Sequence, residues 1–461
     1  MIFSNEWTIA SGFAIWFVAL AAILLVQRGR ALVSVGLVLA YLLGLGVIHV
    51  PGAMLYLDEG YRFYDPELVR LGFQQTAFFV LGFGCGAVIT IWLWRNLRAS
   101  DDSEMLSPVN SFLPDPRVYW TCVAIGLINY FFLAPILGRI PTLSAVSSVL
   151  NQLLLLGICL GMWHGWHTRK WSMLLVWGLF LGLLPVMTML EQGFIGFGVY
   201  ASLTGLAFAF SFMRPRWLLF VIGAGMLFFG LSAFVTYARD RGEIRQVVWG
   251  GESYEERIGQ LVETFSEFEW YDSKNSRQLN SIDQRLNQNH LVGAAVQNVE
   301  SGKVYLRNGD TIVQALLAWI PRIIWADKPA QAGSGDMVTS MTGIKFAEGT
   351  SVGVGQVLEF YMNFGAVGTI VGGMIWGVVL ALLDLIAARA LQFGNIARFM
   401  LYYLVGLSFL QPGGSLVEVV ATAAAAVVVA FFLNNVALPF LFNASDRQKQ
   451  VDAKAIVSSP K

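Results

Sequence analysis

The sequence has few charged residues. Only 13% of its 461 residues are charged, whereas 56% are hydrophobic, and the formal net charge is zero. A soluble domain cannot hide that much apolar surface from water, so the composition indicates a membrane protein with many spans. Because there is no basic excess, nucleic acid is not expected as a partner.

Cysteine and histidine are also scarce. The three cysteines all fall inside apolar segments, which argues against a disulfide framework and against a cysteine zinc cluster. The four histidines show neither an HExxH pattern nor a two-His-one-carboxylate spacing, and no Walker phosphate loop or dinucleotide-binding glycine pattern is present. We therefore expect no metal, nucleotide or other cofactor.

Apolar runs long enough to cross a bilayer recur along the chain. No Lys or Arg precedes Arg28, so the first run lacks the positive region of a cleavable signal and is predicted to be retained. The sequence thus predicts an all-α polytopic membrane protein with about eleven transmembrane helices, at residues 8–26, 31–50, 71–94, 118–137, 142–163, 171–190, 192–212, 217–237, 356–385, 399–414 and 416–437.

The basic residues predict the orientation. With the N-terminus outside, the short outer loops hold only Arg62, Arg70 and Arg139, and the other Arg and Lys residues outside the long region 238–355 fall in the inner loops and the tail. The positive-inside rule then places that region in the periplasm of a bacterial inner membrane. We predict an N-terminal bundle of eight spans (1–237), a large periplasmic loop (238–355), three further spans (356–437) and a cytoplasmic tail (438–461).

The long region 238–355 reads as mainly helical. Residues 252–270 predict an amphipathic helix with an acidic face, and residues 281–300 predict a second helix on which Asp283 and His290 share one side. Residues 303–310 contain Asn308 and Gly309, a turn signal that closes a small hairpin or restarts the chain before the next helix. An apolar run at 312–320 is too short to span and is predicted to lie in the membrane interface, and a glycine-rich flap follows at 331–355.

Other residues in the apolar segments have both structural and functional interpretations. Glu191, Glu359 and Glu418 all fall near the outer boundary, where they line a polar cavity or are ordinary interfacial carboxylates. Glycines 82, 84 and 86 are predicted to be helix packing positions.

Two neighbouring segments carry a family resemblance. Residues 320–329 read IPRIIWADKP, and residues 359–368 read EFYMNFGAVG after a glycine-rich gap. Together with the topology, they resemble the oligosaccharide repeat-unit polymerases (Wzy-type, O-antigen polymerase-like). The resemblance implies a glycosyltransferase-C-like bundle that joins polyprenyl-diphosphate-linked repeat units at the periplasmic face during O-antigen, capsule or exopolysaccharide biosynthesis. Implied partners are these lipid-linked oligosaccharides, the bilayer, and a chain-length regulator and a flippase of the same pathway.

A mechanism that fits both the residues and the resemblance needs cations and a base. Arginines can neutralise a diphosphate leaving group in place of a metal ion, and a base deprotonates the acceptor hydroxyl. Glu359 is the first choice for the base because it lies in the resembling segment. The predicted catalytic residues are Glu359, Arg322, His290 and Asp283, and the predicted substrate-binding residues are Lys328, Arg285, Arg239, Tyr361 and Asn363. The structural alternative for the cations is ordinary interfacial snorkelling.

Two other functions remain open at this point. O-antigen ligases share the general plan but usually carry a His in the segment that opens the span after the large loop, and residues 353–359 have none, so His290 would have to replace it. A polysaccharide or lipid transporter, or a scaffold subunit, is less well supported because the sequence shows no internal repeat and its ionisable residues gather at one face.

The predicted topology has a direct test. Alkaline phosphatase fused after Asn308 should be active because that residue is predicted to be periplasmic, and a fusion after Ser445 should be inactive. The opposite pair of activities would overturn the orientation.

Overall fold

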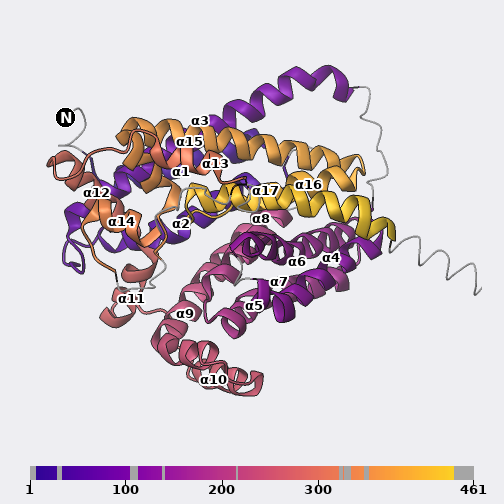
Figure 1. Ribbon diagram of the computed structural model, residues 1–461, viewed down its shortest axis with the longest axis horizontal. Coiled ribbons are helices and arrows are strands. Elements are labelled where there is room, and N and C mark those ends of the chain that lie inside the picture. Colours follow the sequence, from indigo (N-terminus) through magenta and orange to yellow (C-terminus); the bar gives the residue numbers. More distant parts are fainter. Residues whose placement is uncertain are drawn as a thin grey trace, which may run out of the picture.

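The computed structural model describes residues 7–27, 34–103, 113–137, 141–213, 216–320, 325, 334–346 and 352–440. The structure is 81% helical, and no strand occurs in these residues. This confirms the all-α class that the periodic apolar runs predict. Figure 1 shows the long helices running roughly side by side along the longest axis.

The helices of the first half follow the predicted spans closely. Each predicted run corresponds to one helix or to a helix with a short π-helical turn. The helices are α1 (Ile9–Val26), α2 (Leu37–Leu55), α3 (Pro66–Ser103), α4 (Pro116–Ile128), the π-helical turn η1 (Asn129–Leu133), α5 (Ala134–Leu137), α6 (Pro141–His167), α7 (Trp171–Gln192), α8 (Gly196–Phe212) and α9 (Arg216–Trp249).

The helices of the long region follow, and then three apolar helices complete the described chain. Those of the long region are α10 (Tyr254–Ser266), α11 (Ser276–Leu286), α12 (Asn289–Glu300), α13 (Asp310–Leu317) and α14 (Ser334–Thr342). The later ones are α15 (Gly355–Gln392), α16 (Ile396–Ser408), α17 (Leu416–Phe432) and the π-helical turn η2 (Leu433–Ala437). In Figure 1, α11, α12 and α14 gather at one end of the bundle, which we call the loop end.

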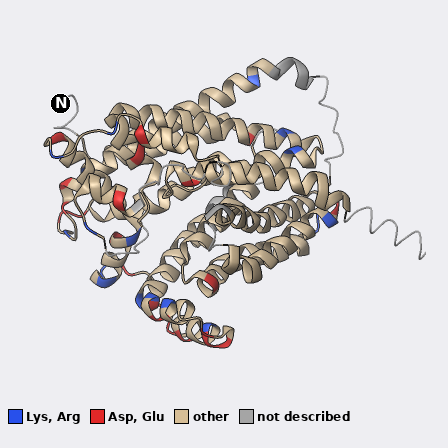
Figure 2. Ribbon diagram, viewed as in Figure 1, with Lys and Arg blue, Asp and Glu red and all other residues tan. Residues whose placement is uncertain are grey.

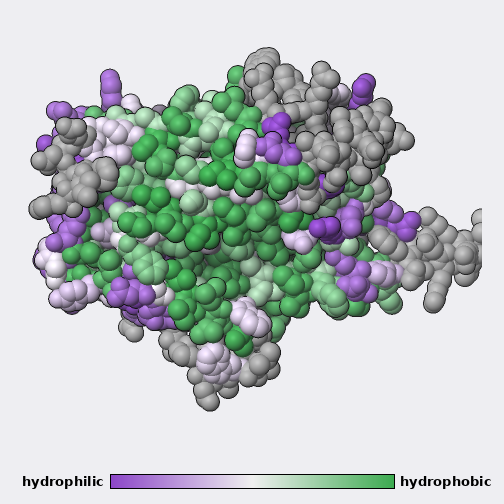
Figure 3. Space-filling model, turned by 90° about the horizontal axis from the view of Figure 1, so that it is seen from above, coloured by the Kyte–Doolittle hydropathy of each residue, from purple (hydrophilic) through white to green (hydrophobic). Residues whose placement is uncertain are grey.

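The apolar helices make this a multi-pass membrane protein. In the described residues, eight helices are long and apolar enough to cross a membrane, and α8 and α16 are shorter apolar helices. Most charged residues lie toward the two ends of the molecule and on α10 (Figure 2), and a continuous apolar band separates the hydrophilic ends in the space-filling view (Figure 3). This distribution is the one that a bilayer imposes.

The structure corrects one prediction for the loop region and decides between two alternatives for another segment. Residues 281–300 form two helices rather than one, because the chain turns at Asn287: its side chain bonds Asp283 and the Asn289 backbone, and the next amide, of Gln288, donates to the Ile48 carbonyl at 2.9 Å. Residues 303–310 restart the chain instead of forming a hairpin, with Gly309 (φ 93°) capping α13.

Glycines bring α3 and α15 into close contact. A Cβ atom at Gly82 or Gly86 of α3 would lie 2.0 or 2.2 Å from a backbone oxygen of α15, and one at Gly373 or Gly377 would lie 2.3 or 2.2 Å from an oxygen of α3. The two helices therefore face each other through glycine pairs spaced four residues apart, the small-xxx-small arrangement of membrane helices. The prediction that these glycines serve packing is confirmed for positions 82 and 86.

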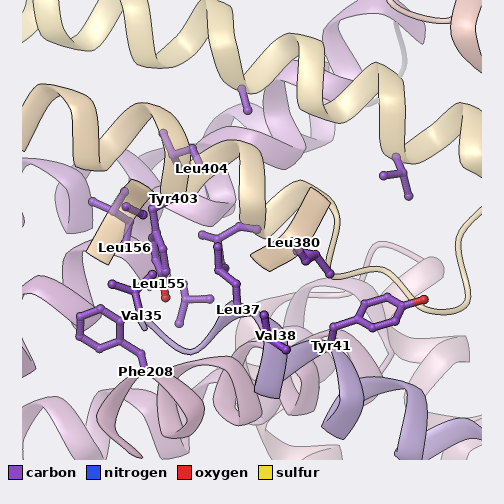
Figure 4. Close-up of a cluster of buried hydrophobic side chains, with 14 of the residues drawn as sticks. Val35, Leu37, Val38, Tyr41, Leu155, Leu156, Phe208, Leu380, Tyr403 and Leu404 are labelled. Atoms are coloured by element: carbon purple, nitrogen blue, oxygen red, sulfur yellow. The ribbon is translucent and has the colours of Figure 1, made fainter. Parts of the chain in front are cut away.

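The apolar core lies where α2, α6, α8, α15 and α16 converge. Figure 4 shows side chains from all five helices pointing toward one another, among them Leu37, Leu156, Phe208, Leu380 and Tyr403. All of these are buried. The core thus joins the first helices, the middle of the chain and the last helices into one bundle.

The glycine contact gives a stability prediction. In Gly86→Ala, the added methyl group would meet the Met374 carbonyl oxygen, which belongs to backbone and cannot move aside, so we expect a loss of about 1–3 kcal/mol of stability. Gly178→Ala in α7, where no atom lies within 4 Å of the added carbon, is the matched control and should leave the melting temperature unchanged or raised. Thermal unfolding in detergent measures both, and equal melting temperatures would contradict the packing role.

Candidate functional site

Asp283 is buried at the loop end among tyrosines. The Tyr56 hydroxyl donates to Asp283 Oδ2 at 2.7 Å, and Asn287 Nδ2 donates to Oδ1 at 2.6 Å. Burial raises the pKa of the Asp283 carboxyl, and the hydrogen bonds from Tyr56, Asn287 and Tyr61 oppose that rise. Both carboxyl oxygens already accept hydrogen bonds, so Asp283 is better placed to orient its neighbours than to take a proton.

His290 lies beside this carboxyl cluster on α12. Its ring stacks on Tyr64 with centroids 3.9 Å apart and an interplanar angle of 5°, and its Nδ1 faces the Asn287 carbonyl oxygen at 2.7 Å. Because a carbonyl oxygen only accepts, Nδ1 must carry the hydrogen, which leaves the lone pair of the neutral ring on Nε2. Burial lowers the pKa of His290, so the ring is neutral at pH 7. Although they belong to different helices, Asp283 and His290 are joined through Asn287.

Three arginines form the second part of the site. Arg241 and Arg245 are one helical turn apart on α9, and Arg285 comes from α11. The pKa of Arg241 is lowered to about 10 by burial first and then by repulsion from Arg285 and Arg245, while Tyr237 opposes the shift. The three guanidinium groups therefore lie within electrostatic range of one another. We call them the arginine cluster.

Among the described residues, the arginine cluster has no compensating carboxylate. No ion pair of the described residues involves Arg241, Arg245 or Arg285, and Arg241 Nε is buried without a hydrogen-bond partner. Arg245 lies over the Phe194 ring at 4.2 Å and donates to the Gly193 carbonyl. Gathered cations, of which Arg241 and Arg245 are partly buried and Arg285 is exposed, are suited to a multiply charged anion.

Tyr64 connects the cluster to the carboxyl group. Burial raises the pKa of Tyr64, Asp283 raises it further and Arg285 lowers it. Both charged residues are therefore close to the same ring that stacks on His290. The predicted residues Asp283, Arg285 and His290 thus come together at one place in the fold.

The prediction that Arg239 binds substrate needs correction. All five of its N–H groups are already used: two bond Asp240, one bonds Glu269 at 3.1 Å, and two bond the Glu267 and Thr264 carbonyls. These charged partners raise its pKa further, with Asp240 contributing most. Arg239 therefore fastens α9 to the segment after α10.

Glu359 and Asn363 form a separate buried group with a structural role. Glu359 Oε2 accepts from the Leu416 amide at 2.7 Å and so caps α17, and Asn363 Oδ1 accepts from the Gly309 amide at the start of α13. Asn363 Nδ2 donates to the Thr311 hydroxyl. All these side chains are buried, as is Tyr361. The predicted roles of Glu359 as an accessible base, and of Tyr361 and Asn363 as sugar ligands, do not fit these positions.

A kink in α15 makes this arrangement possible. Phe364 and Gly365 leave the helical conformation, and Gly365 has φ 63°, which favours glycine. The carbonyls of Met362 and Asn363 then accept from the Arg307 and Asn308 amides at 2.8 and 3.2 Å. The kink therefore ties the segment before α13 to the start of α15.

Two of the predicted site residues have no described position. Arg322 and Lys328 lie outside the described residues. Within the part of the chain that the structure describes, no group of His, Cys, Asp and Glu side chains is arranged to hold a metal ion.

The sequence did not predict Arg241, Arg245 or the tyrosines of this site. The four-residue spacing of the two arginines on one long apolar helix was the available signal.

Fold and site together define a class: a multi-pass, all-helical membrane protein with an anion-suited arginine cluster beside a neutral histidine at one end of the bundle. The family model described as "Domain of unknown function (DUF8712)" matches residues 117–402, more than half of the chain, so the chain belongs to that family. The search of curated proteins and the search of solved structures each found no match.

The arginine cluster predicts a ligand-dependent stability. Inorganic pyrophosphate should raise the melting temperature of the wild-type protein, by an amount equivalent to about 2.7 kcal/mol at one hundred times its Kd. Arg241→Gln should lose this response. Because folding lowers the pKa of Arg241, its charge costs stability at neutral pH, and the variant should melt higher than the wild type without ligand.

A matched variant controls for a general charge effect. Arg277→Gln removes an exposed arginine that is paired with Glu269, so its response to pyrophosphate should equal that of the wild type. If Arg241→Gln responds as strongly as Arg277→Gln does, the cluster is not an anion site.

Proposed function

We propose that this protein is a polysaccharide polymerase of the bacterial inner membrane. It joins polyprenyl-diphosphate-linked oligosaccharide repeat units at the periplasmic face, with eleven membrane spans, its N-terminus outside and its C-terminus in the cytoplasm. The proposal rests on the sequence resemblance at residues 320–329 and 359–368 and on the geometry of the loop end.

The arginine cluster is the observation that carries the proposal. A polyprenyl diphosphate presents several negative charges at the membrane boundary, and a leaving diphosphate needs its developing charge stabilised. Arg241, Arg245 and Arg285 supply cations that no carboxylate of the described residues neutralises. Arginines hold their charge in partly desolvated surroundings and can bond two phosphoryl oxygens at once. Arg322 and Lys328 remain predicted further ligands of the same group.

His290 is the proposed base. In the transfer step, Nε2 takes the proton of the acceptor hydroxyl, the hydroxyl oxygen forms a bond to the anomeric carbon of the donor, and the bond from that carbon to the diphosphate oxygen breaks with its electron pair staying on the diphosphate. Nδ1 keeps its hydrogen bond to the Asn287 carbonyl throughout. Asp283 acts as a positioning residue, because it binds Asn287, whose carbonyl accepts from His290, and Tyr56, whose hydroxyl accepts from the amide of Tyr64, the residue stacked on the imidazole.

A ligase-like transfer is the second candidate, favoured by the same histidine. The ligase resemblance asks for a His near the lipid-linked donor, and His290 lies beside Arg285 through their shared neighbour Tyr64. The two functions use one donor and one chemistry. They differ in product, since a ligase adds its glycan once to a different acceptor and a polymerase makes a series of lengths.

The test uses purified full-length protein in liposomes with a lipid-linked repeat unit, in EDTA and without nucleotide. We expect a ladder of products, and His290→Gln should lower its rate by about 10²–10⁴-fold. Because the pKa of His290 is lowered from 6.5, the wild-type rate should stay constant as pH falls to about that value and decline only below it.

His164→Gln is the matched control, since that histidine lies in the last turn of α6 and contacts the Pro114 carbonyl instead of the site. It should keep the full ladder. A single product size would favour the ligase function, and an unchanged ladder in His290→Gln would eliminate His290 as the base. No product at all from a lipid-linked unit would remove the support for glycosyl transfer.

A further inference from the structure

The short helix α13 has an unusual distribution of side chains. The side turned to the protein carries the small residues Thr311 and Ala315, and the C-cap Ala318 continues it, all three buried. The opposite side carries Val313 and Leu316, which are 56% and 63% exposed, and Trp319 in the turn after the helix is 61% exposed. A helix on a water-facing surface has the reverse pattern, with its polar residues outward. The exposed side of α13 is thus as apolar as that of a membrane span.

Polar residues of α13 are confined to one flank. Asp310 and Gln314 are one turn apart and are joined by a hydrogen bond of 3.1 Å. On the helix circumference they lie between the buried small residues and the exposed apolar ones. The helix therefore separates three environments: protein, water along a narrow flank, and an apolar phase over the rest.

The exposed apolar side continues onto α15. Beyond the kink, Val367, Val371 and Ile375 are exposed along one side of α15, in the part of the chain that crosses the membrane. Phe364 begins this row, and its ring is the nearest neighbour of Gly309, the residue that caps α13. Figure 1 shows α13 lying against the bundle beside α15 and α17. The two apolar sides thus meet at Phe364.

We infer that α13 is a membrane-embedded element of the long region, with Val313, Leu316 and Trp319 in contact with the acyl chains of the bilayer leaflet at the loop end. The continuity with the lipid-exposed side of α15 identifies the occupant as lipid, because the same hydrocarbon must cover both. A helix of this kind, which enters one leaflet without crossing it, is stable because its backbone bonds are internal and the Asn363 side chain caps its start. The inference does not depend on glycosyl transfer.

Contacts with α15 fix the position of α13 in the membrane. The Arg307 and Asn308 amides and the Gly309 cap are held by the start of α15, so α13 is fixed relative to the membrane span instead of floating above it. Asn363 and Gly365, which belong to the segment that carries the family resemblance, therefore determine the depth of α13. This gives these two residues a role that does not require contact with a sugar.

Site-directed spin labelling tests the inference. Cys85, Cys122 and Cys159 are replaced by Ala in the full-length chain, and single cysteines are introduced as Val313→Cys and Leu316→Cys. Val367→Cys, 70% exposed on α15, is the lipid control, and Tyr305→Cys, 85% exposed before α13, is the water control. Power-saturation EPR in proteoliposomes compares relaxation by apolar oxygen with relaxation by a water-soluble nickel chelate.

We expect the labels at positions 313 and 316 to behave like the label at 367, with oxygen the stronger relaxant, whereas the label at 305 should respond more to nickel. A nickel response at 313 and 316 equal to that at 305 would show that α13 faces water and would overturn the inference. Shielding from both relaxants, or broadening from a second label nearby, would show a protein partner or a second copy of the chain on this side and would overturn it equally. The two label positions on α13 are independent, so one poorly folded variant does not prevent the test.

Discussion

The close contact between α3 and α15 is the constraint on which the rest of the structure depends. Glycines at positions 82, 86, 373 and 377 let the two backbones approach more closely than any residue with a Cβ atom would allow. Lipid chains are as apolar as the helices, so association in a membrane comes from close packing and internal hydrogen bonds. This contact joins the first third of the chain to its last quarter. α3 packs against α12 through glycines in the same way, because Gly72 and Gly293 each face backbone atoms of the other helix.

Once fixed against α3, α15 organises its other neighbours through two buried carboxylates. Asp384 Oδ1 accepts from the Val35 and Leu37 amides at 3.1 and 2.9 Å and so caps α2, and Glu359 caps α17 in the same way. Each carboxylate supplies the acceptor that the first amides of a helix lack, in a place where no water could do so. A carboxylate buried in an apolar helix usually raises the expectation of a functional site. Here the capping bonds explain Asp384 and Oε2 of Glu359 structurally, whereas Oε1 of Glu359 is buried without a hydrogen-bond partner among the described residues. Glu359, first among the predicted bases, therefore acts as a cap through one of its two oxygens.

The candidate site lies away from these caps, where the chain leaves the apolar band. It combines residues from the α2–α3 connection, α9, α11 and α12, which are far apart in sequence. Asp283 and His290 could be selected from sequence because a carboxylate and a histidine in a predicted outer loop are obvious candidates. Arg285 could be selected as well, whereas Arg239 could not be told apart from Arg241. They differ in their partners: Arg239 is surrounded by Asp240, Glu269 and carbonyl groups, whereas the neighbours of Arg241 among the described residues are other cations and Tyr237.

The sequence by itself determined the all-helical class, the approximate place of every long apolar helix and the packing role of glycines 82 and 86. Hydrophobic periodicity, length and spacing are local properties, so no contact between distant segments was needed to recognise them. Only the tertiary structure decided that residues 281–300 form two helices, that Glu359 and Asn363 are caps, and which arginines remain unpaired. Each of these depends on a partner from another part of the chain: Ile48 for the turn at Asn287, Leu416 and Gly309 for the caps, and the segment after α10 for Arg239. A buried hydrogen-bonding group pairs with whichever group the fold places next to it, and the local sequence does not determine which group that is.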